Sequence, residues 1–238
     1  MFRRTSMGMV GGALAASCFL AGCDSAPPPS IPTAEWQQPF DTIQHYWSVT
    51  RGLGKLGVRL RIIEPGEREV CGNYTDTAYS KSIGNYCPDD NTVYISSGSY
   101  KAFETEYVAK GGNARALKIL FMGHEEGHAV QEKYRSVEEP PSKVPALNKR
   151  HEQQADCLDG ELISGLGGIS LGEAQLMYDV FDIITPLTAA ELRKDDHGRE
   201  PERFRAFVRG GDKEYGVIAG CGLVLPTEYP NGKVTAGV

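Results

Sequence analysis

Apolar residues follow two different periods along this chain. Residues 58–63 alternate between apolar and polar side chains, as a half-buried strand does, and residues 92–96 predict a second strand. Residues 40–50 carry apolar side chains at helical spacing, and the pattern after residue 100 is helical. The pattern therefore predicts an α+β fold that is predominantly helical, with a small β-sheet from the N-terminal half.

Turn and capping residues predict where the helices begin and end. Asn113 follows two glycines and is suited to cap a helix that runs to about residue 134, and a second helix is expected over about 145–163. Capping boxes at Ser170–Glu173 and Thr188–Glu191 each predict another helix. A last helix should begin at Pro201, end before Gly210-Gly211, and point three apolar side chains inward: Phe204, Phe207 and Val208.

Residues 1–22 have the features of a secretory signal peptide. Arg3-Arg4 provides a positive start, residues 10–20 are small and apolar, and Leu20-Ala21-Gly22-Cys23 places small residues at a cleavage site. This last segment resembles the lipobox of bacterial lipoproteins, which implies cleavage before Cys23, lipidation of Cys23 and a membrane anchor in the cell envelope. A plain signal peptide with a chance cysteine, or a twin-arginine export signal, are the alternatives.

Composition sets the remaining boundaries. Residues 23–39 are rich in Pro and Ser, which is typical of an extended tether, and residues 40–238 are expected to form the folded domain. The 238 residues are 40% hydrophobic and 24% charged, as in ordinary globular proteins. The net charge of −6 provides no basic surface for a nucleic acid.

Four cysteines remain after removal of the signal peptide and lipidation of Cys23: Cys71, Cys87, Cys157 and Cys221. An even number outside the cytoplasm predicts two disulfides with three possible connectivities, of which Cys71–Cys87 with Cys157–Cys221 is favoured. A zinc–cysteine site is the competing interpretation, but the chain has no CxxC spacing.

The motif His124-Glu125-Glu126-Gly127-His128 carries the candidate chemistry. Residues four apart on a helix share one face, so both imidazoles can reach a single ion, and Glu125 can reach a water held by that ion. Two core histidines bonded to nearby carbonyl groups are the structural alternative. Gly123 and Gly127 each cost about 1 kcal/mol relative to Ala in a helix interior, which indicates that a strand or another helix approaches closely there.

A catalytic zinc site needs three protein ligands, so a third must come from outside this helix. Glu152 and Asp156 share one face of the helix expected over 145–163, where one carboxylate can bind the metal and the other can accept the free N–H of a ligand histidine. A solvated acidic face is the alternative. His151 is the rival third ligand, but neighbours on a helix point about 100° apart, and the apolar periodicity favours Glu152.

Three motifs in order are similar to those of the bacterial "putative neutral zinc metallopeptidase" family, whose pattern is HExGHHVQ, ELQADCxAG and HGxxxxQR. They are His124-Glu125-x-Gly127-His128-x-Val130-Gln131, Glu152-x-Gln154-Ala155-Asp156-Cys157-x-x-Gly160, and His197-Gly198-x-x-x-x-Arg203. The segments around Cys71, Cys87 and residues 92–95 also match the family's pattern, so the resemblance spans about residues 40–221 with gaps.

The resemblance implies a zincin-like domain with a gluzincin-like site that binds one Zn²⁺ per chain. His124, His128 and Glu152 would be the metal ligands, Asp156 would bond to a ligand histidine, and Glu125 would be the general base. Three positions depart from the family pattern: Glu126 replaces an apolar residue, Ala129 replaces His, and Asp159 replaces Ala. The carboxylate of Glu126 either alters the charge preference for substrate or faces solvent with little effect.

The leading interpretation is a secreted or lipid-anchored zinc metallopeptidase that acts on peptides or proteins. His197 is a candidate oxyanion donor, or else a turn histidine paired with a carboxylate, and the strand at 92–96 could offer its edge to an extended peptide. A non-catalytic lipoprotein with a structural or partner-binding zinc site, and a zinc amidase that acts on cell-wall peptide, are the alternatives. His45 is left unassigned.

Overall fold

The computed structural model of the protein describes residues 34–67, 71, 83–134, 145–184, 200–212 and 220–222. The predicted signal peptide, the lipidation site Cys23, most of the tether, the helix expected after Thr188 and the candidate donor His197 lie outside these residues. Among the helices that the structure does describe, none combines the length and the apolar character that a membrane crossing requires.

Three strands form a small mixed sheet: β1 (Arg59–Ile63), β2 (Gly84–Cys87) and β3 (Thr92–Ser96). The order is β1-β3-β2, with β1 parallel and β2 antiparallel to β3. Four of the five residues of β3 are buried, which is typical of a central strand covered on both faces. The predicted strands at 58–63 and 92–96 are therefore confirmed, whereas sequence reasoning missed β2.

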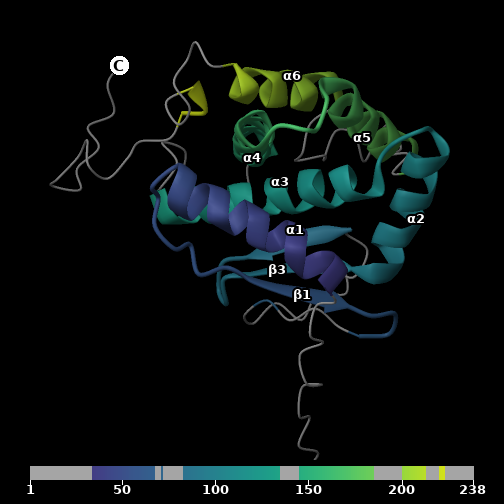
Figure 1. The fold of residues 1–238 in the computed structure, drawn as a ribbon, viewed down its shortest axis with the longest axis horizontal. Coiled ribbons are helices and arrows are strands. Elements are labelled where there is room, and N and C mark those ends of the chain that lie inside the picture. The colour runs from purple at the N-terminus through teal and green to yellow at the C-terminus, as the bar shows by residue number, and fades with distance from the viewer. Residues whose placement is uncertain are drawn as a thin grey trace, which may run out of the picture.

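The helices pack together mainly on one side of this sheet (Figure 1). In chain order they are α1 (Ala34–His45), continued by the short π-helix η1 (Tyr46–Thr50), α2 (Ser97–Ala109), α3 (Ala114–Tyr134), α4 (Pro145–Leu166), α5 (Leu171–Ile184) and α6 (Glu200–Gly211). The prediction of a mostly helical α+β fold with a small sheet is thus confirmed.

Local capping follows the sequence closely. The Asn113 side-chain oxygen accepts hydrogen bonds from the backbone N–H groups of Arg115 (2.9 Å) and Ala116 (3.3 Å), which caps α3 as expected. Ser170 and Glu173 form the reciprocal contacts of a capping box at the start of α5.

The first helix begins earlier than predicted. It starts at Ala34, so residues 34–39, which were expected to belong to the tether, are helical. Trp36 is buried, with its ring 4.6 Å from that of Tyr100 on α2, and this packing orders the segment despite the prolines before it. Tertiary contact has overridden local composition.

Helix α3 lies at the centre of the molecule. Figure 1 shows it between the sheet on one side and α4 on the other, with α6 beyond α4 and with α2 and α5 at one end. Leu117, Leu120, Met122 and Val130 of α3 are fully buried. A helix covered on several faces is rigid, which suits it to position functional side chains.

Two glycines allow α4 and α6 to cross in backbone contact. A Cβ at Gly160 would overlap the carbonyl oxygen of Phe207, and a Cβ at Gly210 would overlap that of Cys157. On α6, Phe207 is buried as predicted, but Val208 is 38% exposed, so its predicted inward orientation is wrong. Arg203 of α6 is buried as well, and its guanidinium pairs with Asp156 of α4.

The two favoured disulfides are both present. Cys71–Cys87 joins the segment before β2 to the end of that strand, and Cys157–Cys221 joins the middle of α4 to residues 220–222. Closing a loop of about 15 residues stabilises a fold by roughly 3 kcal/mol in the chain-entropy model, and a longer loop by more. The second disulfide holds residues 220–222 against α4.

The crossing of α4 and α6 generates a stability prediction. Gly160→Ala should lower the free energy of unfolding by about 1–3 kcal/mol, because the added methyl forces two helix backbones apart. Gly172→Ala is the matched control, since the nearest atom to an added Cβ there is the Ser170 hydroxyl oxygen at 3.8 Å, and the change should be neutral or stabilising by about 1 kcal/mol at most. Urea denaturation followed by circular dichroism measures both, and equal stability of the two variants would contradict the described crossing.

Candidate metal centre

The two histidines of the HExxH motif stand on one face of α3, one turn apart. Their ring centroids are 4.9 Å apart, and each side chain is about 12% exposed. His124 and His128 both turn their Nε2 atoms toward α4, where Glu152 lies 28 and 24 positions further along the chain. The helical spacing thus presents two nitrogens to one point, as the motif predicts.

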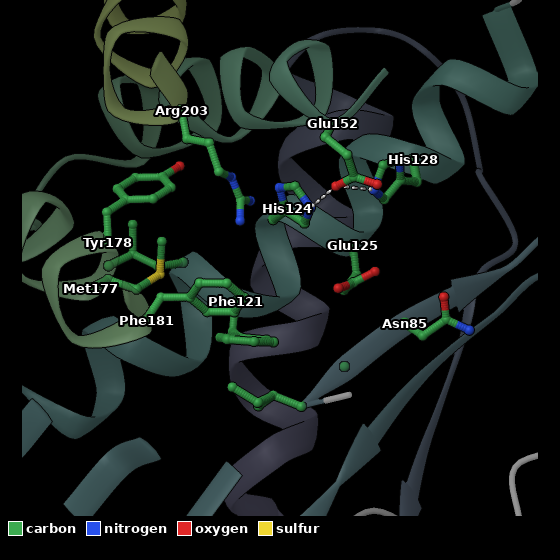
Figure 2. A pocket seen from close by; sticks show the side chains of 13 residues that line it. Asn85, Phe121, His124, Glu125, His128, Glu152, Met177, Tyr178, Phe181 and Arg203 are labelled. Carbon is green, nitrogen blue, oxygen red and sulfur yellow. Dashed lines mark hydrogen bonds and ion pairs between the residues drawn. The ribbon is translucent and has the colours of Figure 1, made fainter. Parts of the chain in front are cut away.

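Glu152 of α4 reaches that same point. Its Oε2 lies 3.2 Å from His124 Nε2 and 3.5 Å from His128 Nε2 (Figure 2). One ligand atom from each of the three side chains lies within 4.8 Å of the other two. In the part of the chain that the structure describes, no other three His, Cys, Asp or Glu side chains meet this criterion.

His151, the rival third ligand, lies outside this group of three. Its ring stacks on that of His128 at a centroid distance of 5.0 Å and an interplanar angle of 19°. Burial and the positive potential of His128 lower its pKa to about 4, so it is neutral at physiological pH. The structure therefore brings Glu152, and not His151, to the two histidine nitrogens.

The close approach of α3 and α4 depends on the two glycines in the motif helix. A Cβ at Gly127 would lie 3.0 Å from the carbonyl oxygen of Ala155, and a Cβ at Gly123 would overlap Asp159. These glycines predicted that a strand or another helix approaches closely. That element is α4, the helix that carries Glu152.

The buried ion pair between Asp156 and Arg203 contacts His124 on the Nδ1 side of its ring. The Nδ1 of His124 is 2.9 Å from Oδ1 of Asp156, and both Asp156 oxygens accept hydrogen bonds from Arg203, at 2.9 Å from Nε and 2.7 Å from a terminal nitrogen. The Tyr178 hydroxyl also donates to Asp156, at 3.1 Å. These contacts join α3, α4, α5 and α6 at one carboxylate.

The charges in this group shift one another's protonation. Burial by itself raises the pKa of Asp156, but the Arg203 guanidinium and His124 outweigh it and hold the pKa below its usual range. Burial by itself lowers the pKa of His124, but hydrogen bonds to Asp156 and Glu152 raise it to about 10. The two carboxylates thus favour a positive charge at His124.

His128 is held by a different network. Its Nδ1 lies 2.7 Å from the side-chain oxygen of Gln131, whose amide nitrogen donates to the backbone oxygen of His151 and to the side-chain oxygen of Gln154, both at 2.8 Å. Gln154 in turn donates to the backbone oxygen of Cys221, which connects the network to the Cys157–Cys221 disulfide. Gln131 and Gln154 both lie within the sequence motifs, but the sequence alone did not predict a role for either.

Glu125 and Glu126 point in different directions. Glu125 is buried and lines the pocket beside the histidines, and Figure 2 shows its carboxylate on the side toward Asn85 of β2. Glu126 is fully buried against α1, where it accepts a hydrogen bond of 2.5 Å from Gln44, and burial raises its pKa to about 8. Neither expectation for Glu126 is correct, because it faces neither the pocket nor solvent. Ala129 packs in the core.

The strand beside the site is β2 rather than β3. Because β3 lies between β1 and β2, both of its edges are paired, and the expectation that residues 92–96 offer an edge to a peptide is wrong. The strand β2 is at the edge of the described sheet, and Gly84 and Asn85 line the pocket.

This arrangement defines the class of protein: a helical domain with an HExxH helix and a third acidic side chain from the next helix, as in zinc-dependent peptidases. The family described as "putative neutral zinc metallopeptidase" matches residues 60–204, more than half of the chain, and the protein belongs to this family. No curated protein and no solved structure matches the chain significantly.

The buried ion pair generates the prediction of this subsection. Arg203→Met should lower the free energy of unfolding by about 3–5 kcal/mol at neutral pH, because it leaves the Asp156 carboxylate buried without its partner. Arg205→Met, on the exposed face of α6, should change it by no more than about 0.5 kcal/mol. Chemical denaturation measures both values, and a similar small effect in both variants would contradict this role for Arg203.

Proposed function

We propose that this protein is a zinc metallopeptidase of the cell envelope that hydrolyses peptide bonds with Glu125 as general base. One observation carries the proposal: His124 Nε2, His128 Nε2 and Glu152 Oε2 converge from two helices on one point beside a pocket. Membership of the zinc metallopeptidase family supports the same activity.

The residues fit a zinc ion. Two imidazole nitrogens and one carboxylate oxygen are a donor set of catalytic zinc sites, which keep a fourth position for water or substrate. The other nitrogen of each histidine already has a partner, Asp156 for His124 and Gln131 for His128, which leaves both Nε2 atoms available as ligands. A zinc ion bound there lowers the pKa of a bound water toward 7 and polarises a carbonyl group.

Glu125 performs the proton transfers in the proposed mechanism. It accepts a proton from the attacking water and passes it to the nitrogen of the leaving amine. Its place on α3, directly after His124 and in the wall of the same pocket, is what supports this role. The Asp156 carboxylate, 2.9 Å from Nδ1 of His124, favours the proton on Nδ1 and so the tautomer whose Nε2 can bind metal.

The edge strand β2 is the proposed docking element for substrate. Extended peptides add to sheet edges through backbone hydrogen bonds, and β2 lies at the edge of the sheet that the structure describes and in the wall of the pocket. A peptide aligned on β2 would lie across the site on the side toward which Glu125 points.

We further propose that Cys23 is lipidated and anchors the protein to a membrane. The lipobox-like Leu20-Ala21-Gly22-Cys23 supports this, and disulfides fit a protein outside the cytoplasm. Growth with a labelled fatty acid should label the wild-type protein, and Cys23→Ser should abolish the label and move the protein to the soluble fraction. Label retained in the variant would refute the anchor.

Metal content is the first test of the site. The purified wild-type protein should contain about one zinc per chain by elemental analysis, and His128→Ala should lose most of it because two ligands remain. His45→Ala is the matched control, since His45 is exposed on α1, and it should retain the metal. Equal zinc in all three proteins would argue against the proposed ligands.

Activity is the second test. Glu125→Gln should reduce the rate of casein or peptide cleavage by about 10²–10⁴-fold with zinc still bound, because the change removes the base and no ligand. Glu132→Gln, on the exposed surface of α3, should leave the rate unchanged.

The outcome also separates the alternatives. A rate insensitive to chelator and to Glu125→Gln would leave the non-catalytic lipoprotein as the better interpretation. Hydrolysis of purified peptidoglycan without cleavage of casein or peptides would favour the zinc amidase.

A further inference from the structure

The candidate metal centre lies at one end of a pocket of about 270 Å³, and the proposed proton transfers use only the end that holds the histidines and Glu125. It lies between α3, α5 and β2, and Figure 2 shows Phe121, Met177 and Phe181 on the far side of His124 from His128. Its apolar walls come from six side chains: Ile83, Leu120, Phe121, Met177, Tyr178 and Phe181.

Aromatic packing holds the walls in place. The Phe121 ring lies 5.8 Å from that of Phe103 and 6.1 Å from that of Tyr100, and Phe103 is in turn 6.3 Å from Phe181. A Cβ at Gly84 would lie 3.0 Å from the Phe121 ring, so β2 also fixes this side chain. The shape of the pocket is therefore largely formed before any ligand binds.

The far end of the pocket presents no uncompensated charge. Arg203 is the one Lys or Arg side chain in the described lining, and its guanidinium bonds to both oxygens of Asp156 while lying 5.5 Å from the centre of the Phe181 ring. The acidic residues Glu125 and Glu152 lie at the end with the histidines. An acidic or basic substrate side chain would lose hydration in this pocket without gaining a partner.

The volume suits a single side chain. Sites for drug-sized ligands occupy about 300–1,000 Å³. The volume of about 270 Å³ is slightly smaller than these sites, so the pocket has room for one large side chain of a peptide. Met177 is the adaptable part of the wall, because an unbranched thioether can adjust to different occupants.

We propose that this pocket binds a large apolar side chain, Phe, Tyr, Leu or Met, of a residue that flanks the scissile bond. This inference rests on the proposed function and adds a substrate class to it. Phe121, Met177 and Phe181 are the specificity-determining residues, and Met177 sets the size limit.

The experiment compares blocked pentapeptides Ala-Ala-X-Ala-Ala with X varied over Phe, Leu, Ala, Gly, Lys and Glu. The zinc-loaded wild type should cleave beside X with a kcat/KM at least about tenfold higher for Phe or Leu than for Gly, Lys or Glu. Met177→Phe, which fills the pocket, should move the preference toward Ala, and Met177→Ala should move it toward Trp. Leu176→Ala, on the same helix and outside the pocket lining, is the control and should keep the wild-type preference.

A binding measurement separates this inference from the proposed function. Zinc-loaded Glu125→Gln protein should bind the Phe peptide at least about tenfold more tightly than the Gly or Lys peptide by calorimetry. Cleavage without preference, or equal binding of all peptides, would overturn the inference and leave the peptidase proposal intact. Selective binding of Phe with no cleavage by the wild type would support the pocket and refute the peptidase.

Discussion

The close contact between α3 and α4 is the constraint on which the site depends. Side chains from two helices can share one ion only if the helix axes run close together, and bulky residues at the crossing keep axes 8–10 Å apart or more. The backbone of α4 occupies the space that a side chain at position 127 would need. The Asp159 side chain of α4 occupies the space that a side chain at position 123 would need. The two glycines lower the stability of the helix locally, but they let α4 approach closely enough for Glu152 to reach both histidines.

Asp156 makes this contact rigid. A carboxylate with no solvent exposure is unfavourable by itself, and here Arg203, Tyr178 and His124 surround it. Because these partners come from three other helices, the position of His124 depends on the packing of the whole helical layer. The same Arg203 that stabilises Asp156 also lines the pocket, so one buried ion pair contributes to both the metal centre and the pocket wall.

The departures from the family pattern lie in the interior rather than at the pocket. Glu126 has a pKa of about 8 because it is buried, so it is mostly neutral at pH 7 and can accept the bond from Gln44 without a buried charge. Asp159 is fully buried, its pKa is raised well above the usual range by that burial, and neither oxygen has a hydrogen-bond partner among the described residues. Nothing in the structure explains the carboxyl group at position 159.

Local signals in the sequence were sufficient for much of the fold and for the core of the candidate site. The cap at Asn113, the capping box at Ser170 and the alternation at 92–96 are short-range patterns, and each element formed as predicted. The spacing of His124 and His128 likewise follows from helix geometry alone. The second strand partner of β3, by contrast, was not predicted: β2 is four residues long and contains Gly and Asn, which carry little strand signal.

The sequence by itself determined which residues stand on one face of a helix, where helices begin, and which family the chain resembles. Only the tertiary structure decided that β3 is the central strand, that Glu126 faces α1, that Val208 is exposed while Arg203 is buried, and that the first helix begins at Ala34. The physical reason is the same in each case. Periodicity describes one element at a time, whereas the side of an element that meets another, and the charge that pairs with a distant residue, depend on packing between segments far apart in the chain.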